Sequence, residues 1–348
     1  MTEGELQPQE ALASLLSGQD LTQDQTAGLF GRLMDGELDD SLQAALLVAL
    51  SAKGESPEEI AGAAIAMRSR VVPVRSEREA LVDTCGTGGD SRGTFNISTA
   101  AALVAAAAGT PIAKHGNRSV SSRSGSADVL AALGVGIEMG PSQAGRALDE
   151  IGLTFLFAPG FHPAMREVMP VRRRLGIRTI FNLLGPLTNP AGARRQVLGV
   201  YAAELVPVMA RVLARLGCDH ALVLHGEDGL DELTTTAATH VAEVRVSNIE
   251  TFRLTPESLG LDRVPMSELA GGDPESNAEK MLAVLQGEPG PLAEITALNA
   301  AAALYVGGQV GDLREGVEKA RRVLASGEGL TKLDELRAFS AQPGEEKA

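Results

Sequence analysis

The fold is decided by the stretch Asp83-Thr84-Cys85-Gly86-Thr87-Gly88-Gly89-Asp90. It continues the apolar run Ala80–Thr84, which predicts a strand, and it leads to the alanine-rich segment Ser98–Ala108, which predicts a helix. Its glycines allow the backbone to approach a ligand closely and to turn its amide groups inward. The start of the helix offers free N–H groups and a positive dipole end, and both suit phosphate. By spacing alone, the stretch fits an ordinary strand–turn–helix connection equally well.

The glycine loop matches neither of two common phosphate-binding motifs. No Gly-Lys-Ser/Thr follows it, as a Walker loop requires, and Ser91 stands where G-x-G-x-x-G requires its last glycine.

A second loop strengthens the case for phosphate. After the apolar run Pro111–Ala113, residues 114–122 carry cations, an amide and hydroxyls but no carboxylate. This mixture suits a phosphate or diphosphate.

Apolar runs and helical patterns alternate along the rest of the chain. Further strands are predicted at Phe155–Phe157, Val197–Tyr201, Ala221–Leu224 and Val241–Val246, and helices at Ala127–Leu133, Ser142–Glu150 and Pro207–Leu216. This alternation predicts an α/β fold with a mostly parallel central sheet flanked by helices. In such sheets ligands bind at the carboxyl ends of the strands, where both polar loops lie.

The opening residues show helical patterns only. Helical spacing is shown by Ala27, Phe30, Leu33 and Met34. Asp40 or Ser41 can cap a helix over Leu42–Ser51. Ser56-Pro57-Glu58-Glu59 combines a capping serine, a proline at the first helical position and acids in the first turn.

These patterns predict two domains. A small all-helical domain is expected over residues 1–72, and a larger α/β domain over residues 73–348. A segment near residues 165–190 breaks the strand–helix alternation, so we expect it to return to the helical domain.

The net charge of the 348 residues is −14, which argues against a general nucleic-acid-binding protein. Positive charge is nevertheless concentrated, because seven arginines and one acid, Glu167, lie between residues 166 and 195. Local positive charge in an acidic protein predicts a site for a small polyanion.

The two cysteines, Cys85 and Cys218, exclude a disulfide framework. With no secretory signal or membrane segment visible, a cytoplasmic protein is expected.

Two further features suggest ligands. Asp231 and Glu232 follow a predicted strand and offer the carboxylate pair that magnesium prefers, together with substrate phosphates and waters. Exposed acids on a loop are the alternative reading. Arg172 can bind a benzoate carboxylate through two hydrogen bonds, although a solvated arginine fits the sequence equally well. Cys85 fits small buried packing better than nucleophilic chemistry. His115 lies in the second loop, and the other histidines show neither metal-ligand spacing nor a catalytic partner.

These motifs resemble those of the anthranilate phosphoribosyltransferases, a glycosyltransferase family that shares its fold with pyrimidine nucleoside phosphorylases. The family's phosphoribosyl-diphosphate loops are matched by Gly86–Asp90, Asn96–Thr99 and Lys114–Ser126. Its anthranilate-side segment is matched by Pro170-Val171-Arg172 and the run from Arg178 to Pro190, and its metal motif by Gly229-Leu230-Asp231-Glu232. The resemblance runs from about residue 10 to 335, with all motifs in the family's order.

The resemblance implies transfer of the 5-phosphoribosyl group from 5-phosphoribosyl diphosphate to the amine of anthranilate, a step of L-tryptophan biosynthesis. It implies a donor site formed by Gly86, Gly89, Asp90, Thr94, Asn96, Ile97, Ser98, Thr99, Lys114 and Ser126. The substrate site also includes His115, Gly116, Asn117, Arg118, Ser119, Val120, Ser121 and Ser122. Anthranilate is expected at Asn117, Arg172 and the edge of Gly86. Magnesium is the expected cofactor, with Ser98, Asp231 and Glu232 as ligands. No residue is assigned as a catalytic group, and a homodimer is expected.

Two other functions stay open at this point. A pyrimidine nucleoside phosphorylase would need a phosphate site and a nucleobase pocket, without a diphosphate-linked metal motif. A non-catalytic relative could bind nucleic acid through the basic stretches. The acid pair Asp231-Glu232 and the net charge of −14 favour the transferase.

Overall fold

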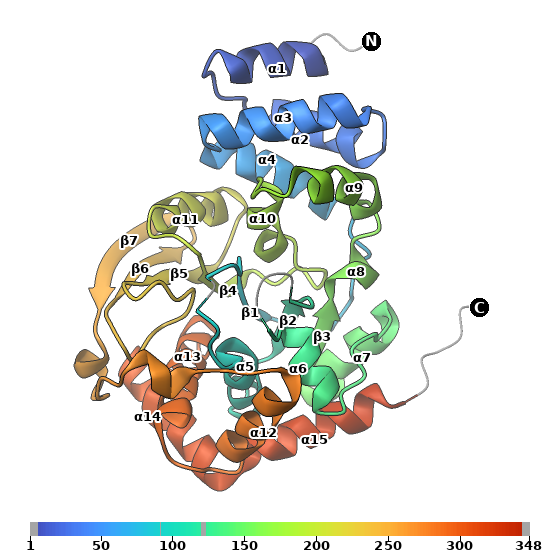
Figure 1. The fold of residues 1–348 in the computed structure, drawn as a ribbon. Helices are drawn as coiled ribbons and strands as arrows, with labels where there is room; N and C mark the ends of the chain where they lie inside the picture. Colours follow the sequence, from blue (N-terminus) through green and yellow to red (C-terminus); the bar gives the residue numbers. More distant parts are fainter. Residues whose placement is uncertain (1–5, 91, 120–122, 343–348) are drawn as a thin grey trace.

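The N-terminal part of the chain is a set of four helices in the computed structural model, which describes residues 6–90, 92–119 and 123–342 (Figure 1). They are α1 (Pro8–Leu16), α2 (Gln23–Met34), α3 (Asp40–Lys53) and α4 (Pro57–Arg68). Helix α4 begins as predicted, because Ser56 caps it and Pro57 occupies its first position. For α3 the predicted cap was wrong: Asp39 caps the helix, since its extended backbone lets the carboxylate accept from the Ser41 and Leu42 amides.

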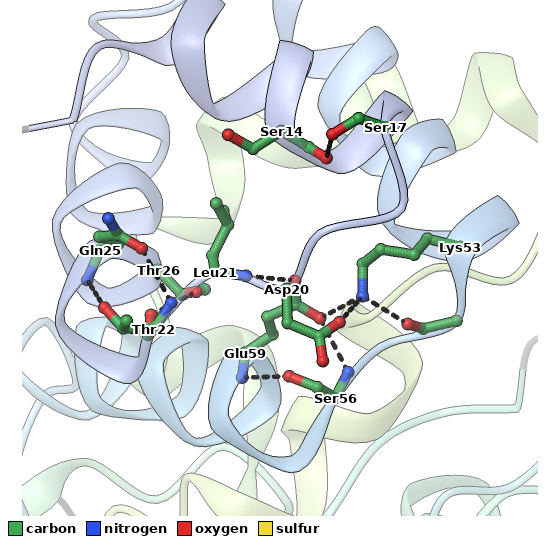
Figure 2. A network of polar contacts seen from close by, with 11 residues as sticks. Ser14, Ser17, Asp20, Leu21, Thr22, Gln25, Thr26, Lys53, Ser56 and Glu59 are labelled. Atoms are coloured by element: carbon green, nitrogen blue, oxygen red, sulfur yellow. Dashed lines mark hydrogen bonds and ion pairs between the residues drawn. The ribbon is translucent and has the colours of Figure 1, made fainter.

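A buried carboxylate joins the loops of these helices (Figure 2). Glu59 is fully buried and accepts hydrogen bonds from the Leu21 amide at 3.0 Å and the Ser56 amide at 2.8 Å. The Lys53 ammonium lies 2.9 Å from the same carboxylate and 2.5 Å from Asp20. A buried charge is tolerated when it is both ion-paired and hydrogen-bonded, so Glu59 anchors the helical domain.

Replacing Glu59 by alanine is expected to lower the free energy of unfolding by about 3–5 kcal/mol, because Lys53 and two amides lose their buried partner. Chemical denaturation measures the change. The matched control is Glu58→Ala, whose ion pair with Arg215 is exposed and contributes less than about 1 kcal/mol. Similar losses for the two variants would show that the Glu59 network does not anchor the domain.

A seven-stranded sheet forms the centre of the molecule, in the order β3-β2-β1-β4-β5-β6-β7. The strands are β1 (Val82–Gly86), β2 (Ile112–Gly116), β3 (Leu153–Phe157), β4 (Arg195–Gly199), β5 (His220–Gly226), β6 (Thr239–Arg245) and β7 (Asn248–Leu254). Strands β1 to β5 pair in parallel, whereas β6 and β7 pair antiparallel at one edge. The predicted mostly parallel sheet is confirmed.

One strand was not predicted, and the predicted end of another was wrong. Strand β7 was not expected, because its sequence is polar and lies exposed at the sheet edge. Strand β2 extends to Gly116, so Lys114 and His115 lie on a strand and not in the following loop. Polar residues at the end of a buried strand look like loop residues in a sequence, because their partners come from distant segments.

Helices cover both faces of the sheet (Figure 1). They are α5 (Ile97–Ala107), α6 (Ser126–Ala132), α7 (Pro141–Ile151), α8 (Ala158–Phe161), α9 (Met165–Leu175), α10 (Phe181–Leu184), α11 (Leu205–Arg215), α12 (Pro274–Leu285), α13 (Pro291–Val306), α14 (Leu313–Ser326) and α15 (Glu328–Ser340). Short 3₁₀ turns occur at η1 (Gly185–Leu187), η2 (Pro256–Leu259) and η3 (Met266–Leu269). Helices α5 and α13 pack directly on each other. Both are rich in alanine, which allows their backbones to approach closely.

The buried residues form two hydrophobic cores. The first contains α5, α13, α14 and α15 against β1, β2 and β3. The second joins the four N-terminal helices to α9, α10, α11 and the opposite face of β4, β5 and β6. Phe181 of α10, for example, packs against Phe30 of α2 with ring centroids 5.6 Å apart. This packing supports the predicted return of residues 165–190 to the helical domain, and the domain boundary near residue 72 stays a prediction.

Candidate active site

The glycine loop leaves the carboxyl end of β1 and turns beside the end of β4. The Thr87 amide donates to the Gly199 carbonyl at 2.9 Å, and the Thr87 hydroxyl accepts from the Tyr201 amide at 3.1 Å. Gly88 and Gly89 have φ angles of 65° and 83°, which a side chain would strain. The loop therefore needs glycine at these positions, and hydrogen bonds to Gly199 and Tyr201 fix its backbone beside the end of β4.

The acid pair predicted to bind metal meets this loop. Asp231 Oδ2 accepts from the Gly88 amide at 3.0 Å, and Glu232 Oε1 accepts from the Ser98 amide at 3.2 Å, at the start of α5. A Cβ atom at Gly199 would overlap the Asp231 carbonyl. The segment after β5 can therefore lie directly across β4, which brings Asp231 and Glu232 to the carboxyl edge of β1.

Three acids come together at this edge. Asp90, the last residue of the quoted stretch, lies close enough to Asp231 for its charge to act on that carboxyl group. Burial, with the Asp90 charge as a second cause, raises the pKa of Asp231 to about 7. Burial, with the Asp231 charge as a second cause, raises the pKa of Glu232 to about 8. These carboxylates repel one another, so the site favours a positively charged ligand.

Lys114 lies on a strand near the acids and not in the donor loop. It is buried on β2, and its ammonium donates to the Thr84 carbonyl. Burial lowers the pKa of Lys114, and the charges of Asp83 and Glu232 oppose that change. One buried lysine cannot neutralise three acids. The prediction that Lys114 touches the phosphoribosyl donor stays a prediction, and the structure adds a role in balancing charge.

The acid pair fits magnesium when other ligands complete the set. Within residues 6–90, 92–119 and 123–342, no group of three or more His, Cys, Asp or Glu side chains is arranged to hold a metal ion by itself. Magnesium is commonly held by one or two carboxylates, with substrate phosphates and waters as its other ligands. Asp231 and Glu232 offer such a pair beside a helix N-terminus suited to phosphate, so the residues fit magnesium bound together with a diphosphate.

Several residues at the start of α5 that were predicted to bind the donor have their side chains bonded or buried within the protein. The Asn96 side chain does not cap the helix; it donates to the Ser124 carbonyl at 3.2 Å and accepts from Asn277 at 2.8 Å. Ile97 and Thr99 are buried, so only their backbone groups could meet a substrate. Thr94 forms an isolated β-bridge with Ala270. The Ser98 amide donates to Glu232 and the Thr99 amide to the Asn96 carbonyl, so the phosphate site predicted here stays a prediction.

The second polar loop folds around one carboxylate. Asp128 accepts from the Ser119 amide at 3.0 Å, from the Gly125 amide at 2.9 Å and from the Arg118 guanidinium at 2.9 Å. Arg118 is thus already ion-paired in this structure. The Ser126 hydroxyl donates to the Asn117 carbonyl at 3.3 Å. The predicted substrate residues Val120, Ser121 and Ser122 lie outside the described residues.

A histidine pair lies behind this loop. His115 Nδ1 is 3.1 Å from the Gly185 carbonyl, so it must carry the proton, and His115 Nε2 is 3.1 Å from His162 Nε2. His162 Nε2–H is therefore the donor between the rings. His162 Nδ1 is buried without a hydrogen-bond partner among the described residues. The sequence alone did not reveal His162, because its partner lies 47 residues away.

Burial and the neighbouring ring lower the pKa of His115 to about 3, and burial lowers that of His162 to about 4. In the unfolded chain both rings bind protons below about pH 6.5. Stability is therefore expected to fall as the pH drops from about 6.5 to about 4, by up to about 1.4 kcal/mol per pH unit for each ring.

Melting temperatures measured from pH 7 to pH 4 test this for the wild type and for His162→Gln. Glutamine keeps an N–H donor but does not titrate, so the variant should lose less stability on acidification. Equal slopes for the two proteins would contradict the assignment of a neutral pair.

Arg172 lies on α9, beside the second hydrophobic core. Its guanidinium carbon is 5.4 Å from the centre of the Phe181 ring, and its Nη1 is 3.7 Å from the Met169 sulfur. Burial lowers the pKa of Arg172. No ion pair of Arg172 occurs among the described residues, whereas nearby Arg174 pairs with Asp40. A half-buried arginine without a carboxylate partner suits an anionic ligand.

Two family models match the chain. The helical bundle domain of a glycosyl transferase family matches residues 9–71, and the a/b domain of a glycosyl transferase family matches residues 78–330. An anthranilate phosphoribosyltransferase from Anaeromyxobacter sp. (strain K) is 52% identical, with 96% of this chain and 99% of the relative covered. The chain belongs to the anthranilate phosphoribosyltransferase family. The resemblance stated from its motifs is confirmed.

Solved structures of this family share the fold. The crystal structure of the Thermus thermophilus enzyme is 50% identical, with a TM-score of 0.91 and coverage of 95% of this chain and 99% of that one. The Saccharomyces cerevisiae enzyme in complex with PRPP and Mg is 28% identical, with a TM-score of 0.88 and coverage of 96% and 98%. The predicted combination of helical and α/β domains is confirmed for this family member.

Other residues of this family member were missed because their partners are distant. Arg178 donates to the Gly89 carbonyl at 2.6 Å and lies 4.0 Å from the centre of the Tyr201 ring, so it joins the anthranilate-side segment to the glycine loop. Asn189 donates to Asp83 and to the Ala113 carbonyl, each at 2.8 Å. The only sequence signal for either residue was its place in a family motif.

Among the described residues, no helix has both the length and the apolar character needed to cross a membrane.

Proposed function

We propose that this chain transfers the 5-phosphoribosyl group from 5-phosphoribosyl diphosphate to the amine of anthranilate, giving N-(5-phosphoribosyl)anthranilate and diphosphate. The observation that carries the proposal is the meeting of Asp231 and Glu232 with the glycine loop and the start of α5. Carboxylates beside a helix N-terminus suit a metal-bound diphosphate. The named relatives support the same reaction, because they are anthranilate phosphoribosyltransferases.

In the reaction the amine nitrogen forms a bond to C1 of the ribose while the bond from C1 to the diphosphate oxygen breaks. The bonding electrons leave with the diphosphate, and the amine loses one proton. Positive charge develops on the ribose, so alignment and stabilisation of the departing diphosphate are the main tasks. The glycine loop of residues 86–90 and the N-terminus of α5 would orient that group. Magnesium, held by Asp231, Glu232 and Ser98, would supply Lewis-acid stabilisation of it.

The acceptor side is proposed to use Arg172, Asn117 and the edge of Gly86. Arg172 would bind the carboxylate of anthranilate, and this would place the neighbouring aryl amine, a poor nucleophile, against the ribose. We assign no general base, because a His162 pKa of about 4 makes that ring a weak proton acceptor at neutral pH. A Saccharomyces cerevisiae relative in complex with 4-fluoroanthranilate supports an anthranilate site in this fold. The homodimer and the cytoplasmic location stay predictions.

Anthranilate fluorescence, followed with purified protein, tests the proposal. A decay that requires both 5-phosphoribosyl diphosphate and magnesium is the expected result. No decay, with phosphorolysis of uridine or thymidine in its place, would reassign the chain to the nucleoside phosphorylases. Inactivity in both assays, together with a shifted band in a gel-shift with DNA or RNA, would favour the non-catalytic nucleic-acid-binding alternative.

A further inference from the structure

Asn299 lies in the middle of α13, next to the backbone that follows the metal motif. Its side chain is 3% exposed, and its neighbours on the helix are alanines and leucines. An amide in such a place loses its hydrogen bonds to water and must find protein partners. Because helix α13 packs against α5, β1, β4 and β5, those partners can come from segments that carry the site.

All the hydrogen bonds of the Asn299 side chain serve the backbone. Its Oδ1 accepts from the Leu233 amide at 3.0 Å, and its Nδ2 donates to the Leu233 carbonyl at 2.8 Å. Nδ2 also donates to the Ile295 carbonyl at 3.0 Å. The side chain therefore pairs with both backbone groups of Leu233, as a neighbouring strand would in a sheet. Leu233 directly follows Glu232, so these two bonds fix the backbone on one side of that acid.

Asn299 and Glu232 also line the same small cavity. It has a volume of about 10 Å³ and is lined in addition by Thr84, Cys85 and Ser98. The Glu232 carboxylate reaches the Ser98 amide at the edge of this space. A change at Asn299 would therefore alter both the backbone next to Glu232 and the wall opposite its side chain.

The other side of the acid pair is held by Asp228. Its carboxylate accepts from the Leu230 amide at 3.1 Å, from the Thr234 hydroxyl at 2.6 Å and from the Thr236 hydroxyl. Asp231 and Glu232 thus lie between an anchor within their own loop and an anchor on a helix 66 residues further along the chain. Two adjacent like charges repel each other, so a backbone held on both sides is needed to keep them aimed at one ligand.

We infer that Asn299 is a positioning residue for the magnesium-binding carboxylates, and above all for Glu232. The inference rests on the proposed role of Asp231 and Glu232 in holding magnesium with the diphosphate. Partners of metal ligands commonly contribute 10- to 100-fold to metal affinity. Asn299 is buried and its side chain bonds to backbone groups, so its effect should appear in metal and donor binding and not in anthranilate binding.

The test compares Asn299→Leu with Thr296→Val. Leucine has a similar volume but makes none of the three hydrogen bonds. Thr296 is the matched control, because it is fully buried on the same helix and its hydroxyl bonds only within α13, to the Leu292 carbonyl at 2.7 Å. Binding of Mn²⁺ is measured by electron paramagnetic resonance in the presence of 5-phosphoribosyl diphosphate. The magnesium concentration for half-maximal rate and both KM values are measured as well.

Asn299→Leu is expected to weaken Mn²⁺ binding by about 10- to 100-fold and to raise the magnesium requirement by a similar factor, with the KM for anthranilate changed less than about twofold. Thr296→Val should stay within about twofold of wild type in all three. If Asn299→Leu does not fold, Asn299→Ser is used in its place. A folded Asn299 variant with near-wild-type Mn²⁺ affinity, or an equal loss in Thr296→Val, would overturn the inference. Failure of the wild type to bind Mn²⁺ with the donor would overturn the proposed function itself.

Discussion

Asp231→Asn should lower the rate at saturating magnesium by about 100-fold or more and, at the same time, stabilise the metal-free protein at pH 8. Both effects follow from the charge of the Asp231 carboxylate, which would hold magnesium but is unfavourable to bury without it. The folded-state pKa of Asp231, about 7, lies above its ordinary value of 3.8. A carboxyl group with a raised pKa stabilises the fold only while it is protonated, and this contribution is lost as the pH rises through about 7. Asparagine carries no charge to lose.

The difference in melting temperature between Asp231→Asn and wild type should therefore be smallest near pH 4, grow up to about pH 7 and level off above it, in the absence of magnesium. The measurement is a series of melting curves at fixed protein concentration, paired with a magnesium titration of the rate. Glu227→Gln is the control, because Glu227 lies nearby but pairs with Arg253 on the surface. An active Asp231→Asn enzyme with an unchanged magnesium requirement would remove Asp231 from the metal site.

Arg172→Ala is expected to raise the KM for anthranilate by about 30- to 1000-fold, which corresponds to roughly 2–4 kcal/mol, while the KM for 5-phosphoribosyl diphosphate changes only a few-fold. The reason is the environment of the Arg172 guanidinium in the protein without substrate. It is half-buried against Phe181, burial lowers its pKa, and no acid pairs with it among the described residues. A carboxylate that enters supplies the missing partner.

Steady-state kinetics with each substrate varied in turn measure this effect. Arg173→Ala is the matched control, since it removes the same charge from an exposed position on the same helix. Arg172→Lys keeps the charge but cannot form two parallel hydrogen bonds, so its KM should lie between the others. Equal losses for both substrates in Arg172→Ala would show that the arginine supports the fold and not the acceptor site.

The parts of the site that follow from the sequence are those whose chemistry is local. The glycines of residues 86–89 show a turn that other residues cannot adopt, and Asp231 beside Glu232 is a pair visible in one dimension. The supporting contacts are not local. Asn299 looks like one polar residue in an alanine-rich helix until its two bonds to Leu233 are known. His162 likewise gains meaning only when the fold brings it to His115.

The location of Lys114 shows a different limit. Its sequence neighbourhood of cations, amide and hydroxyls predicts a loop that binds phosphate. The structure places the side chain on β2 beneath the acids, with its ammonium on the Thr84 carbonyl. The positive charge of a lysine does not show whether its side chain faces a ligand loop or is buried in the sheet. The burial and direction of the Lys114 side chain are set by the pairing of β2 with β1 and β3.

The second hydrophobic core also bears on how independent the N-terminal helices are. Their apolar side chains share that core with α9, α10, α11 and the face of β4, β5 and β6. An isolated fragment of residues 1–72 would expose the side chains that meet those partners to water, so it should not persist as a folded unit. The intact chain should instead melt in one cooperative step. The two parts recognised by separate family models then form a single thermodynamic unit, in which neither part can be exchanged without rebuilding the surface that it shares with the other.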